Sequence, residues 1–365
     1  MMNNNQAIPV NKDNFKQILT KEFLLVIIVS VPAAIIAEYF NLPLAWFLGP
    51  MIGTTITSFC KIKLKVPKLI LSLILIVLGL YIGYNVDKEL FSHIHEWVWT
   101  SLIMFVYILL SIIIVSKYLQ NFSHYEKKTS IFSAAPGALG PLMILAEHEK
   151  SDLSHVATAH LIRLIIIVTV FPFFVNSFYD TEIINIQNTI QTDQNLIELL
   201  YLVGLSIILI ILFDKIKIPA ALLTGTLVAS GLLQITEIAS YQLPNNIINY
   251  CLMFLGASVG CRFAEKKFSE IANSAFHSLI ATLILVLLGL VAAYVASLII
   301  DKNLFTLILS YCPGGIYEVA VIAIFFDLDP EFVSFHHIIR LLMILFTVPV
   351  FMKVLSIKKS ASDPK

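Results

Sequence analysis

Charged residues are scarce in this sequence. Aspartate, glutamate, lysine and arginine make up 13% of its 365 residues, against about a quarter in soluble domains. Lysine plus arginine and aspartate plus glutamate both number 24, so positive charge is not in excess. Binding nucleic acid needs a concentrated basic surface, and the sequence argues against that function. Hydrophobic residues make up 58% of the chain, which is typical of an integral membrane protein.

Paired cysteines are also lacking. The four cysteines are scattered, without a C-x-x-C pair, at positions 60, 251, 261 and 312. We expect free thiols packed in helices, with neither a disulfide framework nor a zinc site. His93 and His95 form too short a pattern to indicate a metal. We therefore expect no metal and no cofactor.

A cleavable leader is not expected either. The first 21 residues are polar, and a long apolar run follows them. A secretory signal would place a short apolar region sooner and end it at small residues. The sequence predicts a cytoplasmic N-terminal segment at 1–21 and an uncleaved first span at 22–40.

The sequence contains the same pattern twice. Segments 177 positions apart align, namely AAPGALG at 134–140 with YCPGGIY at 311–317, and HLIRL at 160–164 with HIIRL at 337–341. The same offset pairs Gly79 with Gly256 and Gly83 with Gly260. Nearer the start of each copy, LPLAWFLG at 42–49 pairs with IPAALLTG at 218–225 at an offset of 176. We predict membrane repeats at 22–178 and 197–355, a polar linker at 179–196 and a cytoplasmic tail at 356–365.

Each repeat contains five apolar runs long enough to cross about 30 Å of hydrocarbon. They lie at 22–40, 42–59, 69–86, 97–116 and 153–178, and at 197–213, 218–235, 245–261, 275–300 and 331–352. A sixth apolar segment in each repeat, at 130–147 or 307–326, is interrupted by Pro-Gly. The basic residues sort to one side if these two segments do not cross, with both termini cytoplasmic. The predicted fold is all-α, with about ten transmembrane helices in two inverted five-span repeats and a broken or re-entrant segment in each.

The Pro-Gly segments are candidate binding elements. Proline removes a backbone donor and glycine loosens a helix, which frees carbonyl groups and helix N-termini. Irregular backbone at membrane depth persists where it lines protein or a wet cavity. A structural kink is the alternative, although two breaks in register favour a substrate site. The candidate residues are Pro136, Gly137, Gly140, Pro313, Gly314 and Gly315.

Two arginines occupy equivalent places in the repeats. Arg163 and Arg340 fall near the middle of their apolar runs, where an arginine costs at least about 2.5–3.5 kcal/mol to insert. We expect both to face the protein interior and bind substrate, although an arginine nearer a helix end can snorkel to the interface. His160 and His337 lie three residues before them, on the same helix face. His336 has no counterpart, because Ala159 holds that place in the first repeat.

Glu318 is an acid of the second repeat alone, since Pro141 holds its place in the first. An intramembrane glutamate is a candidate for function. We expect it to bind substrate or carry a proton, with Arg340 or Arg163 as its partner. The alternative is a buried ion pair that only fixes packing. The other proton-coupling candidates are His160, His336 and His337.

Several of these features together resemble the AbrB family of bacterial membrane proteins. They are Pro-Gly-Gly at 313–315, Glu318, Ala323, an Asp-containing turn and His-His-x-x-Arg at 336–340. The resemblance implies an internally duplicated membrane domain over nearly the whole chain. Ala138 and Pro141 depart from the family pattern in the first copy. Members are labelled either regulators of the gene for AidB, a stress protein resembling acyl-CoA dehydrogenases, or ammonia monooxygenases. The sequence lacks the clustered histidine and carboxylate ligands that a copper or di-iron monooxygenase needs.

The sequence thus predicts a secondary transporter in the bacterial inner membrane, moving a small anionic or carbonyl-bearing solute with proton coupling. The alternative is a membrane sensor that binds a ligand without net transport and regulates gene expression indirectly. A membrane enzyme is the least favoured class. The expected partners are the lipid bilayer and a small solute, without nucleic acid. The sequence leaves open whether the protein is a homo-oligomer.

Overall fold

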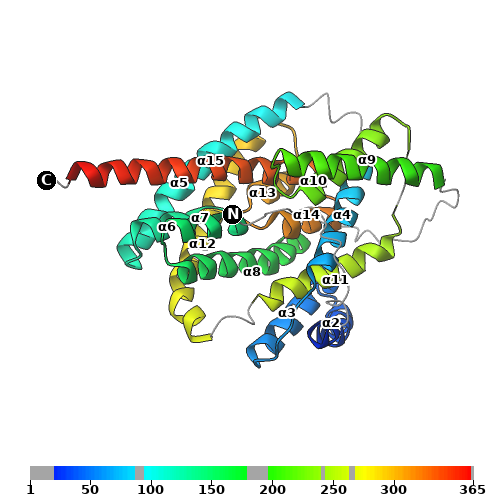
Figure 1. The fold of residues 1–365 in the computed structure, drawn as a ribbon, viewed down its shortest axis with the longest axis horizontal. Coiled ribbons are helices and arrows are strands. Elements are labelled where there is room, and N and C mark those ends of the chain that lie inside the picture. The colour runs from blue at the N-terminus through cyan, green and yellow to red at the C-terminus, as the bar shows by residue number, and fades with distance from the viewer. Residues whose placement is uncertain (1–19, 87–93, 179–195, 240–242, 263–267, 363–365) are drawn as a thin grey trace. The chain divides into compact units, whose positions relative to one another are not determined.

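The computed structural model describes residues 20–86, 94–178, 196–239, 243–262 and 268–362 (Figure 1). Most of the predicted N-terminal segment lies outside the residues whose side chains are described, as do the pair His93 and His95, the predicted linker and the predicted tail. Fourteen helices and no strand make up the regular structure of the described part.

Every predicted apolar run forms a helix. In the first repeat these are α2 (Lys21–Tyr39), α3 (Ala45–Phe59), α4 (Lys68–Tyr84), α5 (Ile94–Phe122) and α8 (Leu153–Phe178). In the second they are α9 (Leu196–Lys215), α10 (Ala221–Ile235), α11 (Asn245–Cys261), α12 (Phe268–Ser297) and α15 (Pro330–Ser362).

Six helices of the described part are long and apolar enough to cross a membrane, namely α2, α5, α8, α9, α12 and α15. The protein is therefore a helical membrane protein. Four further apolar helices are shorter, and α4, with 17 residues, is among the longest of them. At 1.5 Å per residue it is about 25 Å long, less than a typical hydrocarbon core.

In each Pro-Gly segment one helix ends and another begins. The first forms α6 (Lys127–Ala134) and α7 (Leu139–His148), and the second forms α13 (Leu304–Tyr311) and α14 (Ile316–Phe325). With 8 and 10 residues, α6 and α7 are about 12 and 15 Å long. The breaks free backbone groups at four helix ends, and these groups need partners elsewhere.

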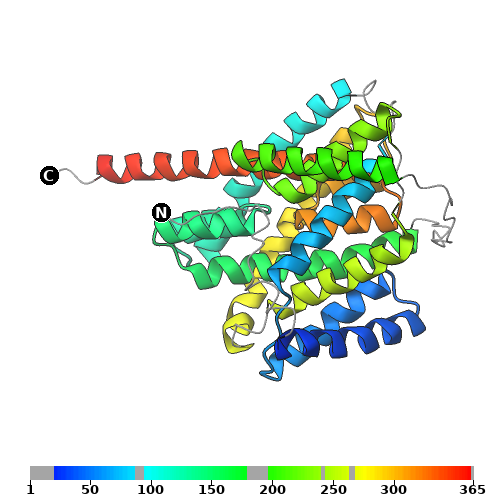
Figure 2. The same cartoon turned by 45° about the vertical axis from the view of Figure 1, so that its right-hand side comes forward.

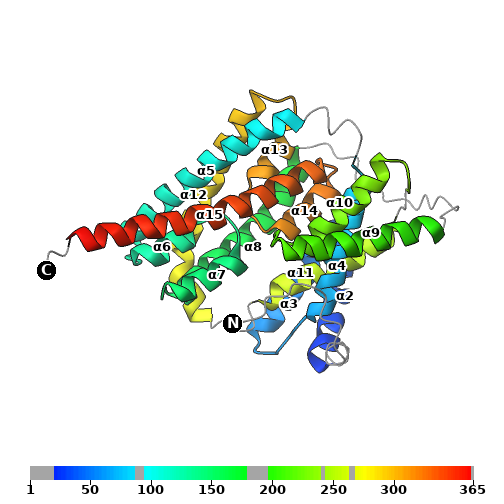
Figure 3. The same ribbon diagram turned by 45° about the horizontal axis from the view of Figure 1, so that its top comes forward.

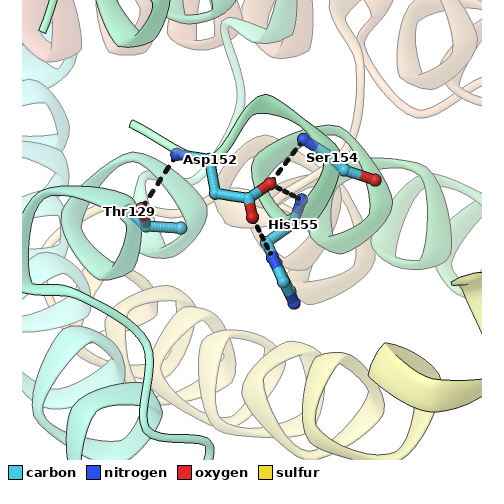
Figure 4. Close-up of polar contacts among 4 residues, drawn as sticks. All are labelled: Thr129, Asp152, Ser154 and His155. Atoms are coloured by element: carbon cyan, nitrogen blue, oxygen red, sulfur yellow. Dashed lines mark hydrogen bonds and ion pairs between the residues drawn. The ribbon is translucent and has the colours of Figure 1, made fainter. Parts of the chain in front are cut away.

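The first broken segment turns back on itself. Lys128 at the start of α6 forms a 2.6 Å ion pair with Glu149, the residue after α7. The backbone N–H of Asp152 donates to Thr129 Oγ1 at 3.1 Å (Figure 4). The chain therefore leaves this segment close to where it entered.

The helices form two compact units, and each unit takes parts of both sequence repeats. Unit 1 contains residues 1–92, 172–267 and 324–331, and unit 2 contains 93–171, 268–323 and 332–365. The offset of 177 carries 1–92 approximately onto 178–269, so each unit holds equivalent parts of the two copies. The compact units and the repeats are thus different divisions of the chain.

Unit 1 is built from reciprocal helix contacts between the copies. The α3 helix packs on α11, and α4 packs on α10. Figure 2 shows α2 and α3, in blue, beside the yellow-green α11. A Cβ added to Gly79 of α4 would overlap the backbone of Leu223 in α10, and one added to Gly256 of α11 would overlap that of Phe47 in α3. Leu223 and Phe47 are themselves equivalent, at the offset of 176.

Hydrogen bonds in unit 1 also join equivalent positions of the two copies. Thr54 of α3 donates to the carbonyl of Ala257 at 3.2 Å, and Ser230 of α10 donates to that of Leu80 at 3.0 Å. Both donors and both acceptors are equivalent in the repeats. The glycines let the helix backbones approach closely, as the predicted G-x-x-x-G packing surfaces require.

Unit 2 contains the broken segments and the candidate site. The α5 helix packs against α6 and α12, and α12 against α13, as Figure 3 lets the eye follow. The part of α8 up to Phe171 and the part of α15 from Phe332 belong to this unit. These two helices carry the paired histidines and arginines.

Candidate functional site

Arg163 of α8 is buried, with 3% of its surface exposed. Its Nη1 donates to the carbonyl of Ala135 at 2.8 Å, and its Nη2 donates to Nδ1 of His160 at 2.6 Å. His160 Nε2 donates in turn to the carbonyl of Phe132 at 3.0 Å. The pair thus joins α8 to the end of α6.

Arg340 of α15 repeats this arrangement and extends it. It is 2% exposed. Its Nη1 donates to the carbonyl of Cys312, and its Nη2 donates to that of Gly314 at 2.6 Å and to His337 Nδ1 at 3.0 Å. His337 Nε2 donates to the carbonyl of Leu309 at 3.1 Å. The predicted interior placement of both arginines is the one the structure shows, so neither snorkels to an interface.

The arginines lie where helix carbonyls lack partners. Ala135 and Cys312 directly follow the last residues of α6 and α13. The last four carbonyls of a helix have no intrahelical donor, and the partial negative charge of this end attracts cations. Each guanidinium group therefore caps the helix that precedes a break. Main-chain acceptors carry no side-chain signature, so the sequence could not predict them.

The contacts fix the protonation pattern of the duplicated histidines. A carbonyl oxygen only accepts, so Nε2 of His160 and of His337 carries the proton. A guanidinium only donates, so Nδ1 of each ring must be bare. Both rings are therefore neutral, and a second proton on either would break its bond to the neighbouring arginine. These contacts favour an orienting role over proton carrying.

His336 has different surroundings. Its Nδ1 donates to the carbonyl of Phe332 at 2.8 Å, and its Nε2 lies 2.7 Å from the hydroxyl oxygen of Thr100. That hydroxyl also lies 3.1 Å from the carbonyl of Trp97. A neutral ring accepts the hydroxyl proton, whereas a protonated ring donates to the hydroxyl, which then turns to Trp97. The ring keeps both hydrogen bonds in either state.

Aromatic side chains enclose this histidine. The ring centroids of Phe332 and His336 are 4.1 Å apart, and Trp97 packs on Phe335 at 4.7 Å. Tyr311, the last residue of α13, donates its hydroxyl to the carbonyl of Thr100 at 2.7 Å. This contact links the histidine's surroundings to the second break. Thr100 lies 236 positions from His336, so no local pattern could indicate the pair.

Arg340 also contacts the first break. A Cβ added to Gly137 would stand 3.1 Å from its Nη2 and 3.3 Å from its Nε. Gly137 has a φ of 120°, which side-chain-bearing residues rarely adopt. Arg340 Nε is buried and has no hydrogen-bond partner. The structure thus brings Gly137, Gly314 and Arg340 together, and Arg340 Nε remains a donor without an acceptor.

The expected ion pair between Glu318 and an arginine is not found. Neither Arg163 nor Arg340 forms an ion pair with any carboxylate in the described part of the chain. Glu318 is 2% exposed and is the third residue of α14. Its carboxylate reaches back over Gly315, where an added Cβ would overlap Oε2. A carboxylate in the first turn compensates the positive end of the helix.

The remaining predicted residues lie around the breaks. Pro136 and Pro313 are buried within them, and Gly315 is half-buried. Gly140, the second residue of α7, is exposed, and a Cβ added there would meet no atom within 4 Å. The described residues contain no group of three metal-binding side chains.

A further polar cluster holds the base of the first broken segment (Figure 4). The carboxylate of Asp152 accepts from the N–H groups of Ser154 at 2.9 Å and His155 at 3.1 Å, and pairs with His155 Nδ1 at 2.8 Å. Burial alone would raise the pKa of Asp152, but the hydrogen bonds and charge of His155 and the bond from Ser154 hold this pKa below its ordinary value. Asp152 is thus the N-cap of α8.

A pocket of about 300 Å³ opens beside this base. It is lined by α6, α7 and α15, with Lys128, Glu149 and Lys353 as its charged residues. Phe132, whose carbonyl accepts from His160, also lines it. The pocket therefore approaches the first histidine–arginine pair.

Known proteins share this chain's sequence over most of its length. A family model described as "Transition state regulatory protein AbrB" matches residues 2–83 and 46–356. "Uncharacterized protein YhjN" of Bacillus subtilis (strain 168) is 22% identical over 339 residues, covering 84% of this chain and 87% of that protein. "Putative regulator AbrB" of Escherichia coli (strain K12) is 23% identical over 319 residues, covering 87% and 91%. No solved structure matches. Since the family model spans most of the chain, this protein belongs to the AbrB family.

Proposed function

We propose that this protein is a secondary transporter of a small organic anion, driven by protons. The observation that carries the proposal is the duplicated arginine–histidine arrangement at two broken helices. Broken helices at matching positions of a duplicated membrane protein are the best indication of a transporter's binding site. Nothing in the arrangement calls for a bound cofactor or catalysis, and we propose no enzymatic activity.

The charge of the arrangement favours an anionic solute. Two guanidinium groups are buried in unit 2, and in the described part of the chain they donate to main-chain carbonyls and neutral histidines. A buried cation is costly unless it meets an opposite charge. Arg340 in addition keeps one donor without a partner. An anion between the breaks would supply the missing charge and acceptor.

The proposed topology has ten spans in two inverted repeats, with both termini cytoplasmic in the inner membrane. The reciprocal contacts of α4 with α10 and of α11 with α3 support a two-fold relation between the repeats. The meeting of Lys128 with Glu149 and of Thr129 with Asp152 supports a re-entrant first segment. Five crossings per repeat then invert the second copy. The shorter helices would cross with local thinning of the bilayer.

We assign proton coupling to His336 and Glu318 rather than to His160 and His337. His336 keeps its hydrogen bonds whether or not it carries a proton, because the Thr100 hydroxyl can reverse. A second proton on His160 or His337 would sit on Nδ1, the atom that now accepts a hydrogen bond from the neighbouring arginine. His336 also adjoins the second break through Thr100 and Tyr311.

The second candidate function is a membrane sensor that regulates gene expression indirectly. One relative, from Escherichia coli, is named a regulator, which favours this reading. A sensor would use the same binding site without net solute movement. The proposed partners in either case are the bilayer and a small solute, without nucleic acid.

Vesicles reconstituted with the purified protein test the proposal. Radiolabelled small organic anions are screened for uptake with an inward proton gradient, with the gradient collapsed, and in protein-free vesicles. We expect gradient-dependent accumulation of at least one anion. Anions that stabilise the protein against heat but never accumulate would favour the sensor and contradict transport.

A further inference from the structure

The two breaks differ at the N-termini of the helices that follow them. After the second break, the carboxylate of Glu318 lies over Gly315 at the start of α14. After the first break, the equivalent positions hold Pro141 and Ala138. Glu318 therefore supplies a carboxylate at the N-terminus of α14. Pro141, at the equivalent position of α7, supplies none.

The N-terminus of α7 offers donors and space. Its N-cap residue, Ala138, is left-handed with a φ of 61° and has no side chain that could accept a hydrogen bond. The first N–H groups of a helix have no intrahelical acceptor. Gly140 is exposed, and a Cβ added to it would meet no atom within 4 Å. An outside group can thus reach this helix end.

Arg340 independently points to a ligand beside this helix end, next to Gly137. Its Nε lies 3.3 Å from the Cβ position of Gly137, the residue before the N-cap. This nitrogen has no hydrogen-bond partner, and it is buried in a residue that is only 2% exposed. A hydrogen bond from an arginine to an anionic oxygen is about twice as strong as a neutral one. A carboxylate at the start of α7 would supply that oxygen.

We propose that the N-terminus of α7 and Arg340 bind a monocarboxylate. The ligand's carboxylate takes at α7 the place that the Glu318 side chain takes at α14. Among the described residues, the buried charged groups at the breaks are two guanidinium groups and one carboxylate, so a single negative charge completes the balance. This inference rests on the proposed function and names its substrate class.

Acetate is the probe for the unmodified protein. The detergent-purified full chain is titrated with acetate, with acetamide as an uncharged match in shape, and with phosphate. We expect acetate to raise the melting temperature and to bind by calorimetry, and we expect acetamide to do neither. Equal effects of acetate and acetamide, or an effect of phosphate alone, would overturn the proposal.

Two pairs of variants test the site, and in each pair one variant adds a carboxylate side chain and the other adds the matching amide. Pro141→Glu introduces in α7 the acid that α14 carries, and Pro141→Gln is its uncharged match. Ala138→Asp and Ala138→Asn form a second pair, because both residues tolerate the left-handed conformation. We expect each acid to weaken acetate binding at least about tenfold relative to its amide, or 1.4 kcal/mol.

The second pair keeps the test decisive if Pro141→Glu does not fold. Equal acetate affinity within a folded acid–amide pair would show that acetate binds elsewhere, and the inference would fall. Acetate exchange in vesicles, corrected for protein-free leakage, separates this result from transport. Binding that depends on these variants without exchange supports the site and contradicts transport. Accumulation of phosphate or a dicarboxylate but not of acetate supports transport and contradicts the site.

Discussion

The guanidinium group of Arg340 lies against Gly137, so the arginine of the second sequence copy contacts the break of the first. Its Nη2 is 3.1 Å from the Cβ position of that glycine. The same Nη2 donates to Gly314 in its own copy at 2.6 Å. One side chain therefore contacts the backbone of both breaks.

Removing Arg340 should cost more than removing Arg163. Arg340→Gln leaves the buried carbonyls of Cys312 and Gly314 without their donor, whereas Arg163→Gln affects that of Ala135 alone. Each unsatisfied group costs about 1–3 kcal/mol. We expect a lower melting temperature for both variants, with the larger fall for Arg340→Gln, and loss of anion binding in that variant.

Arg340→Lys is the matched control for charge. Lysine keeps the positive charge but lacks the planar fork that reaches several acceptors at once. For Arg340→Lys we expect a melting temperature between those of the unmodified protein and Arg340→Gln, and weakened anion binding. Melting temperatures that do not change in any of the three variants would contradict the capping role of both arginines.

The glycines of the breaks should differ in their tolerance of alanine. At Gly137 the positive φ and the nearby guanidinium both oppose a methyl group, and at Gly315 the methyl would overlap Glu318. We expect Gly137→Ala and Gly315→Ala to lower the melting temperature. Gly140→Ala is the control, because a helical alanine there meets no atom and is favoured by about 0.5–1 kcal/mol. Equal stability of all three variants would mean that the glycines are not required by the packing.

The sequence predicted the positions of the paired side chains better than their partners. His160 with Arg163 and His337 with Arg340 could be found because the repeat places them at one offset and one helix face. Their acceptors are main-chain oxygens 28 positions earlier, which residue types do not reveal. An acid and two bases in one apolar region suggested an ion pair for Glu318. In the structure this carboxylate instead lies over Gly315, at the N-terminus of its own helix.

Helix length was the other limit. The apolar runs at 69–86 and 218–235 predicted spans, but α4 begins at Lys68 and ends at Tyr84, and α10 has only 15 residues. At the start of α10 the left-handed Ala220 precedes the first helical residue. Apolar composition continues through such turns, so hydrophobicity marks the membrane region more reliably than it marks helix ends.

His336 should affect proton coupling, whereas His337 should affect binding. His336→Gln removes the ring that can hold a proton between Phe332 and Thr100. We expect anion exchange to continue without the gradient and the stimulation by the gradient to be lost. His337→Gln disturbs the orientation of Arg340, so we expect weaker anion binding with gradient stimulation retained. The reverse pattern, measured in the same vesicles, would contradict the assignment.

Reporter fusions should reveal the inverted topology. The basic residues predict that a reporter after Lys65 or Lys266 lies in the cytoplasm and that one within 180–195 lies outside. A reporter between Glu149 and Lys150 should also be cytoplasmic, because the first broken segment returns to its starting end. An alkaline phosphatase and a fluorescent protein at each position give opposite signals. An outside location for residue 149 would show that the first broken segment crosses the membrane.

Asp152, the N-cap of α8, should stabilise the protein, and this contribution should be lost at low pH. The Asp152 side chain is 50% exposed, so its ion pair with His155 contributes little, and the cap itself is worth about 1 kcal/mol. We expect Asp152→Ala to lower the melting temperature, and Asp152→Asn to lower it less, because the amide oxygen still accepts from Ser154 and His155.

The pH dependence follows from the direction of the pKa shift. Burial acts to raise the pKa of Asp152, but the hydrogen bonds and charge of His155 and the bond from Ser154 lower it below the ordinary 3.8. A carboxyl group with a lowered folded pKa adds stability that is present above its unfolded pKa and lost as pH falls through the folded value. The difference in melting temperature between the unmodified protein and Asp152→Asn should therefore shrink as the pH falls below about 3.8. A difference that does not shrink below that pH would contradict the charge contribution of this cap.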